Sequence, residues 1–283
     1  MTSWIFYAVF GMLQSGLLMA LFKVPAAKQI NKYSLSTWAY LFAMLVAGYV
    51  LRGFIVFDLR AIAFSFVWGV SFAILSIMQM HVLHKHDTSG VFPFTSLTSN
   101  IFVVIGGFFF LHNSISLLQW TAILLSCFLF IGAHWDSKRS FIIGVLPSFM
   151  FIALLSTFNK FVQNAGAHQI EVNNFTFWQL VFTFISSLIM LFFVKKQISL
   201  SNLVHKSLIG WALLIGVLQF GTNYAIVHAL SLGPISLVFI VLGLYTFFTT
   251  VFASILFKEK ITTKKIIFII LSFLVVLLIK LGN

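Results

Sequence analysis

The chain has 283 residues, of which 61% are hydrophobic and only 8% are charged. Soluble domains average roughly 45–50% apolar and about 25% charged residues, so this composition excludes a water-soluble protein and indicates an integral membrane protein. The formal net charge of +12 would suggest nucleic-acid binding in a soluble protein. Here the basic residues lie mostly between apolar runs, so we interpret them as topology signals and expect no nucleic-acid partner.

Ten apolar runs approach the length of about 20 residues that a helix needs to cross a membrane. Strands of a membrane barrel alternate apolar and polar residues, whereas these runs are apolar on every side, so we expect helices. The first run lacks the basic start of a secretory signal, and we expect it to be retained. The runs cover roughly residues 3–22, 35–51, 61–81, 90–111, 117–134, 141–159, 174–194, 208–229, 234–257 and 264–281.

Lysines and arginines divide unevenly between the two sets of alternate loops. Thirteen follow the first, third, fifth, seventh and ninth runs, whereas the other set, with the C-terminus, holds only Arg52, Arg60, Lys160 and Lys280. Positively charged loops stay in the cytoplasm, so we predict a protein of the cytoplasmic membrane with both termini outside. Lys160 would then end the sixth run, where it either attracts an anionic solute or extends its head group to the membrane surface.

Short similarities recur at an offset between 137 and 147 residues. Residues 34–38 resemble 174–178, and residues 68–70 align with 215–217, an alignment that also pairs His81 with His228. Two halves of five helices each must have opposite orientations in the membrane, because five is odd. Such inverted repeats are common in secondary transporters, with the site near the midplane. We therefore predict an all-α integral membrane protein whose ten transmembrane helices form two inverted five-helix repeats, residues 1–136 and 137–283.

The ninth run has the most specific motif. A Gly-Pro pair at 233–234 opens it, and Phe-Lys-Glu-Lys at 257–260 closes it. Together with the ten short-looped runs, this segment resembles the EamA-like branch of the drug/metabolite transporter superfamily, in which each repeat tends to end its fourth helix with an acidic residue. Glu259 fits that pattern, whereas His112 and Asn113 stand at the corresponding place in the first half. The resemblance implies a transporter of small metabolites, often an exporter or exchanger.

Amides inside apolar runs need polar partners, because lipid offers none. Gly216, Gln219 and Asn223 share one helix face through i, i+3 and i+7 spacing. Hydroxyls in such runs often serve only as contacts between helices, and Gly69 and Gly216 more often permit close helix packing than touch a solute. The predicted solute cavity combines amides, hydroxyls and aromatic rings. Its candidate lining is Gln14, Ser76, Gln79, Ser96, Ser99, Asn100, Gln219, Asn223, Tyr224, Tyr245 and Thr246.

Histidines are secondary candidates. His81 and His228 are possible proton relays. His81, His84 and His86 have a spacing that can bind a metal, but Lys85 lies among them and no helical carboxylate accompanies them, so we expect no metal and no cofactor. Cys127 is alone in an apolar run, which excludes a disulfide framework within the chain.

These features favour a secondary transporter that moves a small neutral or zwitterionic metabolite, such as an amino acid, an amine or a nucleobase-like solute, by alternating access. No Walker sequence is present, so direct ATP use is unsupported. No carboxylate occupies the centre of a run, so facilitated diffusion or exchange fits better than carboxylate-based proton coupling. A lipid or lipid-carrier flippase of the same superfamily is the alternative. A membrane enzyme is disfavoured, because paired Asp clusters and His/Glu constellations are missing. The expected partners are the solute and the bilayer, and the expected state is a monomer.

Overall fold

The computed structural model describes residues 4–21, 31–85, 88–112, 115–134, 140–194, 206–257 and 263–282, and within these ranges it contains helices and no strand. The helices are α1 (Trp4–Leu21), α3 (Lys32–Val50), α4 (Leu59–Lys85), α5 (Thr88–Phe110), α6 (Leu117–His134), α7 (Ser140–Gln169), α8 (Val172–Val194), α9 (Lys206–Leu232), α10 (Ile235–Gly243), α11 (Tyr245–Phe257) and α12 (Thr263–Leu281).

Each predicted run coincides with a helix, with two differences. The sixth run was expected to end near residue 159, but α7 continues to Gln169. The ninth run is divided at Leu244 into α10 and α11. The amide of Leu244 donates to the carbonyl of Val241, and the amide of Phe247 donates to that of Leu244, both at 3.1 Å. These i→i+3 bonds tighten the chain locally, which hydropathy does not reveal.

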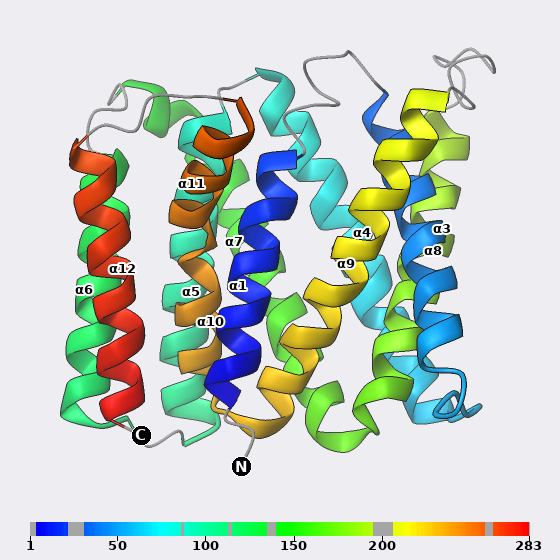
Figure 1. Cartoon of the computed structure of the whole chain (residues 1–283), viewed down its shortest axis with the longest axis horizontal. Helices are drawn as coiled ribbons and strands as arrows, with labels where there is room; N and C mark the ends of the chain where they lie inside the picture. The colour runs from blue at the N-terminus through cyan, green and yellow to red at the C-terminus, as the bar shows by residue number, and fades with distance from the viewer. Residues whose placement is uncertain are drawn as a thin grey trace.

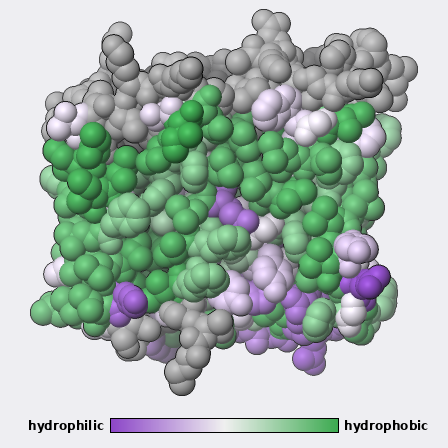
Figure 2. All heavy atoms as spheres, in the orientation of Figure 1, coloured by the Kyte–Doolittle hydropathy of each residue, from purple (hydrophilic) through white to green (hydrophobic). Residues whose placement is uncertain are grey.

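The helices are those of a multi-pass membrane protein. Within the described ranges, five are long and apolar enough to cross a membrane: Trp4–Leu21, Tyr33–Val50, Val172–Phe193, Leu208–Leu232 and Ile235–Leu256, the last of which joins α10 and α11. Shorter apolar helices cover Leu59–Leu75, Thr98–Phe110, Leu117–Leu129 and Ile266–Leu281. Figure 2 shows a hydrophobic face across most of the bundle, with hydrophilic residues gathered along its lower margin.

Figure 1 shows the helices side by side, with both ends of the chain at the lower edge. Helices α6 and α12 pack together at one end of the bundle, and α3 and α8 pack together at the other. In the middle, α1 packs on α9, α10 and α11, while α7 packs on α4, α5 and α9. Helix α7 is thus in contact with helices from both parts of the chain.

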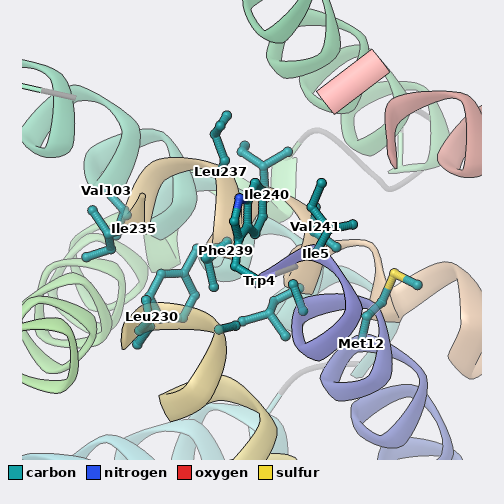
Figure 3. Close-up of a cluster of buried hydrophobic side chains, with 14 of the residues drawn as sticks. Trp4, Ile5, Met12, Val103, Leu230, Ile235, Leu237, Phe239, Ile240 and Val241 are labelled. Carbon is teal, nitrogen blue, oxygen red and sulfur yellow. The ribbon is translucent and has the colours of Figure 1, made fainter. Parts of the chain in front are cut away.

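Helix α10 is the most enclosed element of the bundle, because every one of its residues is buried. Figure 3 shows its side chains beside Trp4, Ile5 and Met12 of α1. Gly233 makes this approach possible, since a Cβ atom at that position would collide with the indole ring of Trp4. The Gly-Pro turn before α10 is therefore fixed by packing against the start of α1.

Two glycines bring helix backbones into direct contact. A Cβ atom on Gly216 of α9 would lie 2.5 Å from the carbonyl oxygen of Ala39 and 2.8 Å from Cβ of Phe42, both on α3. A Cβ atom on Gly69 of α4 would lie 2.7 Å from Cβ of Phe182 on α8. The prediction that Gly69 and Gly216 permit close helix packing is confirmed.

Candidate functional site

Three buried amide side chains form a hydrogen-bonded chain across α7, α8 and α9. Nε2 of Gln163 donates to Oδ1 of Asn223 over 3.0 Å, and Nδ2 of Asn223 donates to Oε1 of Gln179 over 3.0 Å. The exposed fractions of Gln163, Asn223 and Gln179 are 4%, 3% and 0%. Asn223 was predicted from the sequence, and it is the central member of this amide chain.

The amide chain ends on an atom without a partner. Nε2 of Gln179 is buried and makes no hydrogen bond in the described part of the protein. Turning all three amide groups over would reverse the direction of donation and leave Oε1 of Gln179 unpaired instead. In either arrangement one buried polar atom of Gln179 remains without a hydrogen-bond partner in the described part of the protein.

A second polar group surrounds Lys160. Its ammonium nitrogen donates to Oγ of Ser99 over 2.9 Å and to Oδ1 of Asn100 over 2.6 Å. The same nitrogen lies 4.9 Å from the centre of the Phe239 ring, within cation–π range. Ser99 and Asn100 are 0% and 2% exposed, and Nδ2 of Asn100 is buried with no partner among the described residues. We call Lys160, Ser99 and Asn100 the lysine group.

The expectation that Lys160 ends a helix in a loop was wrong. Lys160 lies inside α7, which continues to Gln169, and it is only partly buried. The run seemed to end at Lys160 because several polar side chains follow. These side chains face neighbouring helices instead of lipid, so hydropathy falls although the helix continues.

The polar face of α7 joins the two groups. Lys160 and Gln163 are one helical turn apart on the same face, so their Cβ atoms lie about 5–6 Å from each other. Asn159 beside them donates to the carbonyl of Trp68 over 3.1 Å and to Oγ of Ser71 over 2.8 Å, which attaches α7 to α4. Helix α7 therefore contributes one residue to each group: Lys160 binds residues of α5, and Gln163 binds Asn223 of α9.

Other predicted site residues meet near the division between α10 and α11. The side chain of Tyr245 lies close to that of Ser96 on α5. The hydroxyl of Thr246 is buried, with no partner in the described residues. Two predicted residues, Ser96 and Tyr245, thus lie together, and Thr246 follows Tyr245 on α11.

Gln14 packs against α9 and Gln219 belongs to α9, and neither has a hydrogen bond to the amide chain in the described part of the protein. The side-chain amide of Gln14 occupies the space next to Gly221, where a Cβ atom would lie 2.5 Å from its Nε2. Gln14 is half-buried, and its Oε1 is buried without a hydrogen-bond partner among the described residues. Gln219 is half-buried one turn before Asn223 on α9.

Tyr224 and His228 form an aromatic cluster with Tyr7 of α1. The ring of His228 lies 4.0 Å from that of Tyr224 and 5.0 Å from that of Tyr7. Nδ1 of His228 is 3.0 Å from the carbonyl oxygen of Tyr224. Packing between two tyrosines gives His228 a structural role in this state.

Some predictions fall outside the described part of the structure. The backbones of Ser76, Gln79 and His81 belong to α4, but their side chains are not described. Among the described residues, no group of three or more His, Cys, Asp or Glu side chains is placed to hold a metal.

An apolar pocket opens between α5, α6 and α10. Its volume is about 190 Å³, and it is lined by Asn100, Ile101, Val104, Ile105, Trp120, Ile123, Ser126, Cys127 and Ile240. The apolar lining offers van der Waals contact and no charge, so it could accept a hydrocarbon group.

Sequence reasoning missed Gln163 and Gln179 as parts of the site, and it gave Lys160 only as a residue at the end of the sixth run that either attracts an anionic solute or extends to the membrane surface. A helix drawn to residue 169 would have revealed Asn159, Lys160 and Gln163 as one polar face on α7. Gln179 follows Trp178 in an otherwise apolar stretch. The one sequence signal for Gln179 is that it is an amide inside a predicted membrane span, where lipid offers no hydrogen-bond partner.

Comparison with known proteins gave a family and a fold. The sequence model of the EamA-like transporter family matches residues 139–281, about half of the chain. The search of curated proteins gave no match. A solved crystal structure of another protein superimposes with a TM-score of 0.77, covering 98% of this chain and 99% of that chain at 11% sequence identity. That likeness concerns the fold alone.

Proposed function

Because the chain belongs to the EamA-like transporter family, we propose that it is a secondary transporter of a small neutral or zwitterionic metabolite, working by alternating access as an exporter or exchanger. The solute would be of the size of an amino acid, an amine or a nucleobase. It would bind at the amide chain and the lysine group. The remaining predicted residues, Ser96, Tyr245, Thr246, Gln14, Gln219, Tyr224, Ser76 and Gln79, would form the walls of its path.

The observation that carries this proposal is the buried amide chain with its unpaired end. An unsatisfied buried amide costs about 1–3 kcal/mol. A solute with a hydrogen-bonding group beside Gln179 would remove that cost, whereas lipid would not. Binding of such a solute would be favourable because it supplies the hydrogen bond that the side chain of Gln179 lacks.

The depth of the polar groups supports a site near the midplane. Lys160 precedes the end of α7 by nine residues, and Asn223 precedes the end of α9 by nine. At 1.5 Å per residue, both lie about 14 Å from the lower ends of their helices. The hydrocarbon core of a bilayer is about 30 Å thick, so this depth is close to its middle.

Helix packing supports two inverted repeats with residues 1–136 and 137–283. In the repeat, α1, α3, α4, α5 and α6 correspond to α7, α8, α9, α10 with α11, and α12. If each helix is replaced by its counterpart, the contact between α3 and α9 becomes that between α8 and α4, and the contact between α1 and α9 becomes that between α7 and α4. The same replacement turns the packing of α1 on α10 and α11 into that of α7 on α5, and each of these pairs is in contact. The pairs α3–α8, α5–α10 and α6–α12 are likewise in contact and map onto themselves. Rocking of such halves would open the site to either side in turn.

The proposed orientation puts both termini outside the cytoplasmic membrane. Gly53, in the exposed segment between α3 and α4, has nothing near its Cβ position. In a Cys127→Ala background, Gly53→Cys is expected to react with an impermeant maleimide added to intact cells. Ser201→Cys, in the lysine-flanked segment after α8, is expected to react only after permeabilisation. The opposite labelling pattern would place the termini in the cytoplasm.

Coupling to protons through a carboxylate has no support in the described helices. Glu171 accepts hydrogen bonds from the amides of Asn173 and Asn174, which caps α8, and Asp58 accepts from the amide of Arg60 at the start of α4. Both carboxylates serve helix ends. Facilitated diffusion or exchange is therefore the proposed mode, with His228 and His81 as the only predicted alternatives for proton transfer.

A lipid flippase is the second candidate, and the apolar pocket between α5, α6 and α10 favours it. A hydrocarbon chain fits such a lining. A polar head group crossing the bilayer would still need the amide chain. The two candidates differ in whether a water-soluble solute binds.

Solute-induced stabilisation of the purified monomer tests the proposal. A panel of amino acids, amines, nucleobases and sugars is added, and the thermal unfolding midpoint is measured. At least one class should raise the midpoint in proportion to the logarithm of its concentration, because binding to the folded state adds RT ln(1 + [L]/Kd). A panel without any stabilising solute would contradict the proposal.

A further inference from the structure

We propose that Lys160 and Asn100 bind the carboxylate, or an equivalent single anionic group, of the transported solute. The inference rests on the proposed transport function and narrows its substrate class. It assigns the solute an acid group, as in an amino acid, and excludes solutes that are neutral throughout.

Lys160 has no counter-ion among the described residues. The two carboxylates in the described ranges, Asp58 and Glu171, cap helices, and none of the described residues forms an ion pair with the lysine. Its partners Ser99 and Asn100 are neutral. A cation held between helices without a negative partner is unfavourable, and an anion that enters beside it relieves the desolvation penalty.

Asn100 supplies the second half of the anion site. Its Oδ1 accepts from Lys160, which orients the amide so that Nδ2 is the free donor. Nδ2 is buried and has no partner in the described part of the chain, although Asn100 is only 2% exposed. The ammonium group of Lys160 and the free N–H of the Asn100 side chain that it contacts are both donors, and the two oxygens of a carboxylate are acceptors for such donors.

Lys160 lies on the side of α7 that faces the interior of the bundle. Phe151, Leu154 and Phe158 are exposed to the extent of 53%, 53% and 50% and mark the outward face of α7. At 100° per residue, Lys160 points about 200° away from Phe158, and Gln163 points about 140° away. Lys160 therefore lies on the inward side of α7, the same side as Gln163 of the amide chain.

This geometry also orients the solute. The carboxylate lies at Lys160 and Asn100, and the polar remainder extends one helical turn along α7 toward Gln163 and the unpaired end of Gln179. Phe239 of α10 lies over the ammonium group of Lys160, with its ring centre 4.9 Å away.

Matched compounds that differ only in the acid group test the inference: alanine and alaninamide, benzoate and benzamide, acetate and acetamide. Binding is followed by thermal unfolding of the purified full chain. The wild type should bind at least one carboxylate at least about tenfold more tightly than its amide. Lys160→Arg should retain the preference, and Lys160→Met and Lys160→Gln should lose it.

Lys160→Gln separates binding from structure, because glutamine can still hydrogen-bond Ser99 and Asn100 but has no charge. A lysine with only a structural role would change the unfolding temperature of this variant and leave the ratio between carboxylate and amide binding intact. Equal binding of acid and amide by the wild type overturns the inference even if the variants do not fold. If neutral solutes bind and carboxylates do not, the inference fails and the transport proposal stands; if nothing in either panel binds, both fail.

Discussion

Asn223→Ala is expected to reduce solute affinity at least about tenfold, measured as the solute concentration that half-saturates thermal stabilisation. Asn223 donates to Gln179 and accepts from Gln163, so its removal leaves both glutamines without their shared partner. Each unpaired buried group costs about 1–3 kcal/mol, and 1.4 kcal/mol corresponds to a tenfold change in binding. The two glutamines would then turn toward each other or toward water and would no longer present a fixed atom to the solute.

Gln119→Ala is the matched control for this substitution. Gln119 is 4% exposed and its Oε1 accepts from the amide of Ser116, so it caps α6 away from the amide chain. Its loss should lower stability by about 1 kcal/mol and leave solute affinity unchanged. Unchanged affinity in a folded Asn223→Ala protein would remove Asn223 from the site. An equal loss of affinity in both variants would mean that the effect follows general destabilisation.

Gly216→Leu is expected to prevent α9 from packing on α3. The first added carbon alone would lie 2.5 Å from the carbonyl oxygen of Ala39 and 3.0 Å from the amide nitrogen of Ala43, so backbones must separate. Overpacking costs about 1–3 kcal/mol where side chains can adjust, and backbone atoms adjust less than side chains. The expected result is a large fall in the unfolding midpoint and in the yield of monodisperse protein.

Gly210→Leu on the same helix provides the control. Gly210 is exposed and has nothing within 4 Å of its Cβ position. Leucine has the better helix propensity, so the variant should be at least as stable as the wild type. A Gly216→Leu protein as stable as Gly210→Leu would show that α3 and α9 are not in backbone contact.

The sequence was sufficient to predict the helices, because a helix that crosses a lipid bilayer needs about 20 mostly apolar residues. The run 117–134 coincides with α6 at both ends. The resemblance based on the Gly-Pro turn and the Phe-Lys-Glu-Lys segment was confirmed by the family match over residues 139–281. Close packing at Gly69 and Gly216 could also be predicted, since small residues are what lets helices approach in a membrane.

The site was predicted only in part, because hydropathy averages over a helix and does not show which face a polar residue occupies. Asn223 and Asn100 were predicted to line the cavity, but Gln163, the partner of Asn223, was not, and Lys160, the partner of Asn100, was placed at the end of its run. Lys160 was assigned to a loop because a charged residue usually ends a span. Its hydrogen bonds to Ser99 and Asn100 depend on α5 and α7 lying side by side, which is a tertiary contact that no local pattern encodes.

Solute counterflow in proteoliposomes tests the central claim most directly. Vesicles with purified wild-type protein are loaded with an unlabelled solute from the stabilising class and diluted into a trace of the labelled solute. We predict transient accumulation of label by the wild type and by Gln119→Ala, and at least about tenfold slower accumulation by Asn223→Ala. Absence of flux for every water-soluble solute, together with scrambling of labelled lipid by the same vesicles, would contradict a metabolite transporter and favour the flippase.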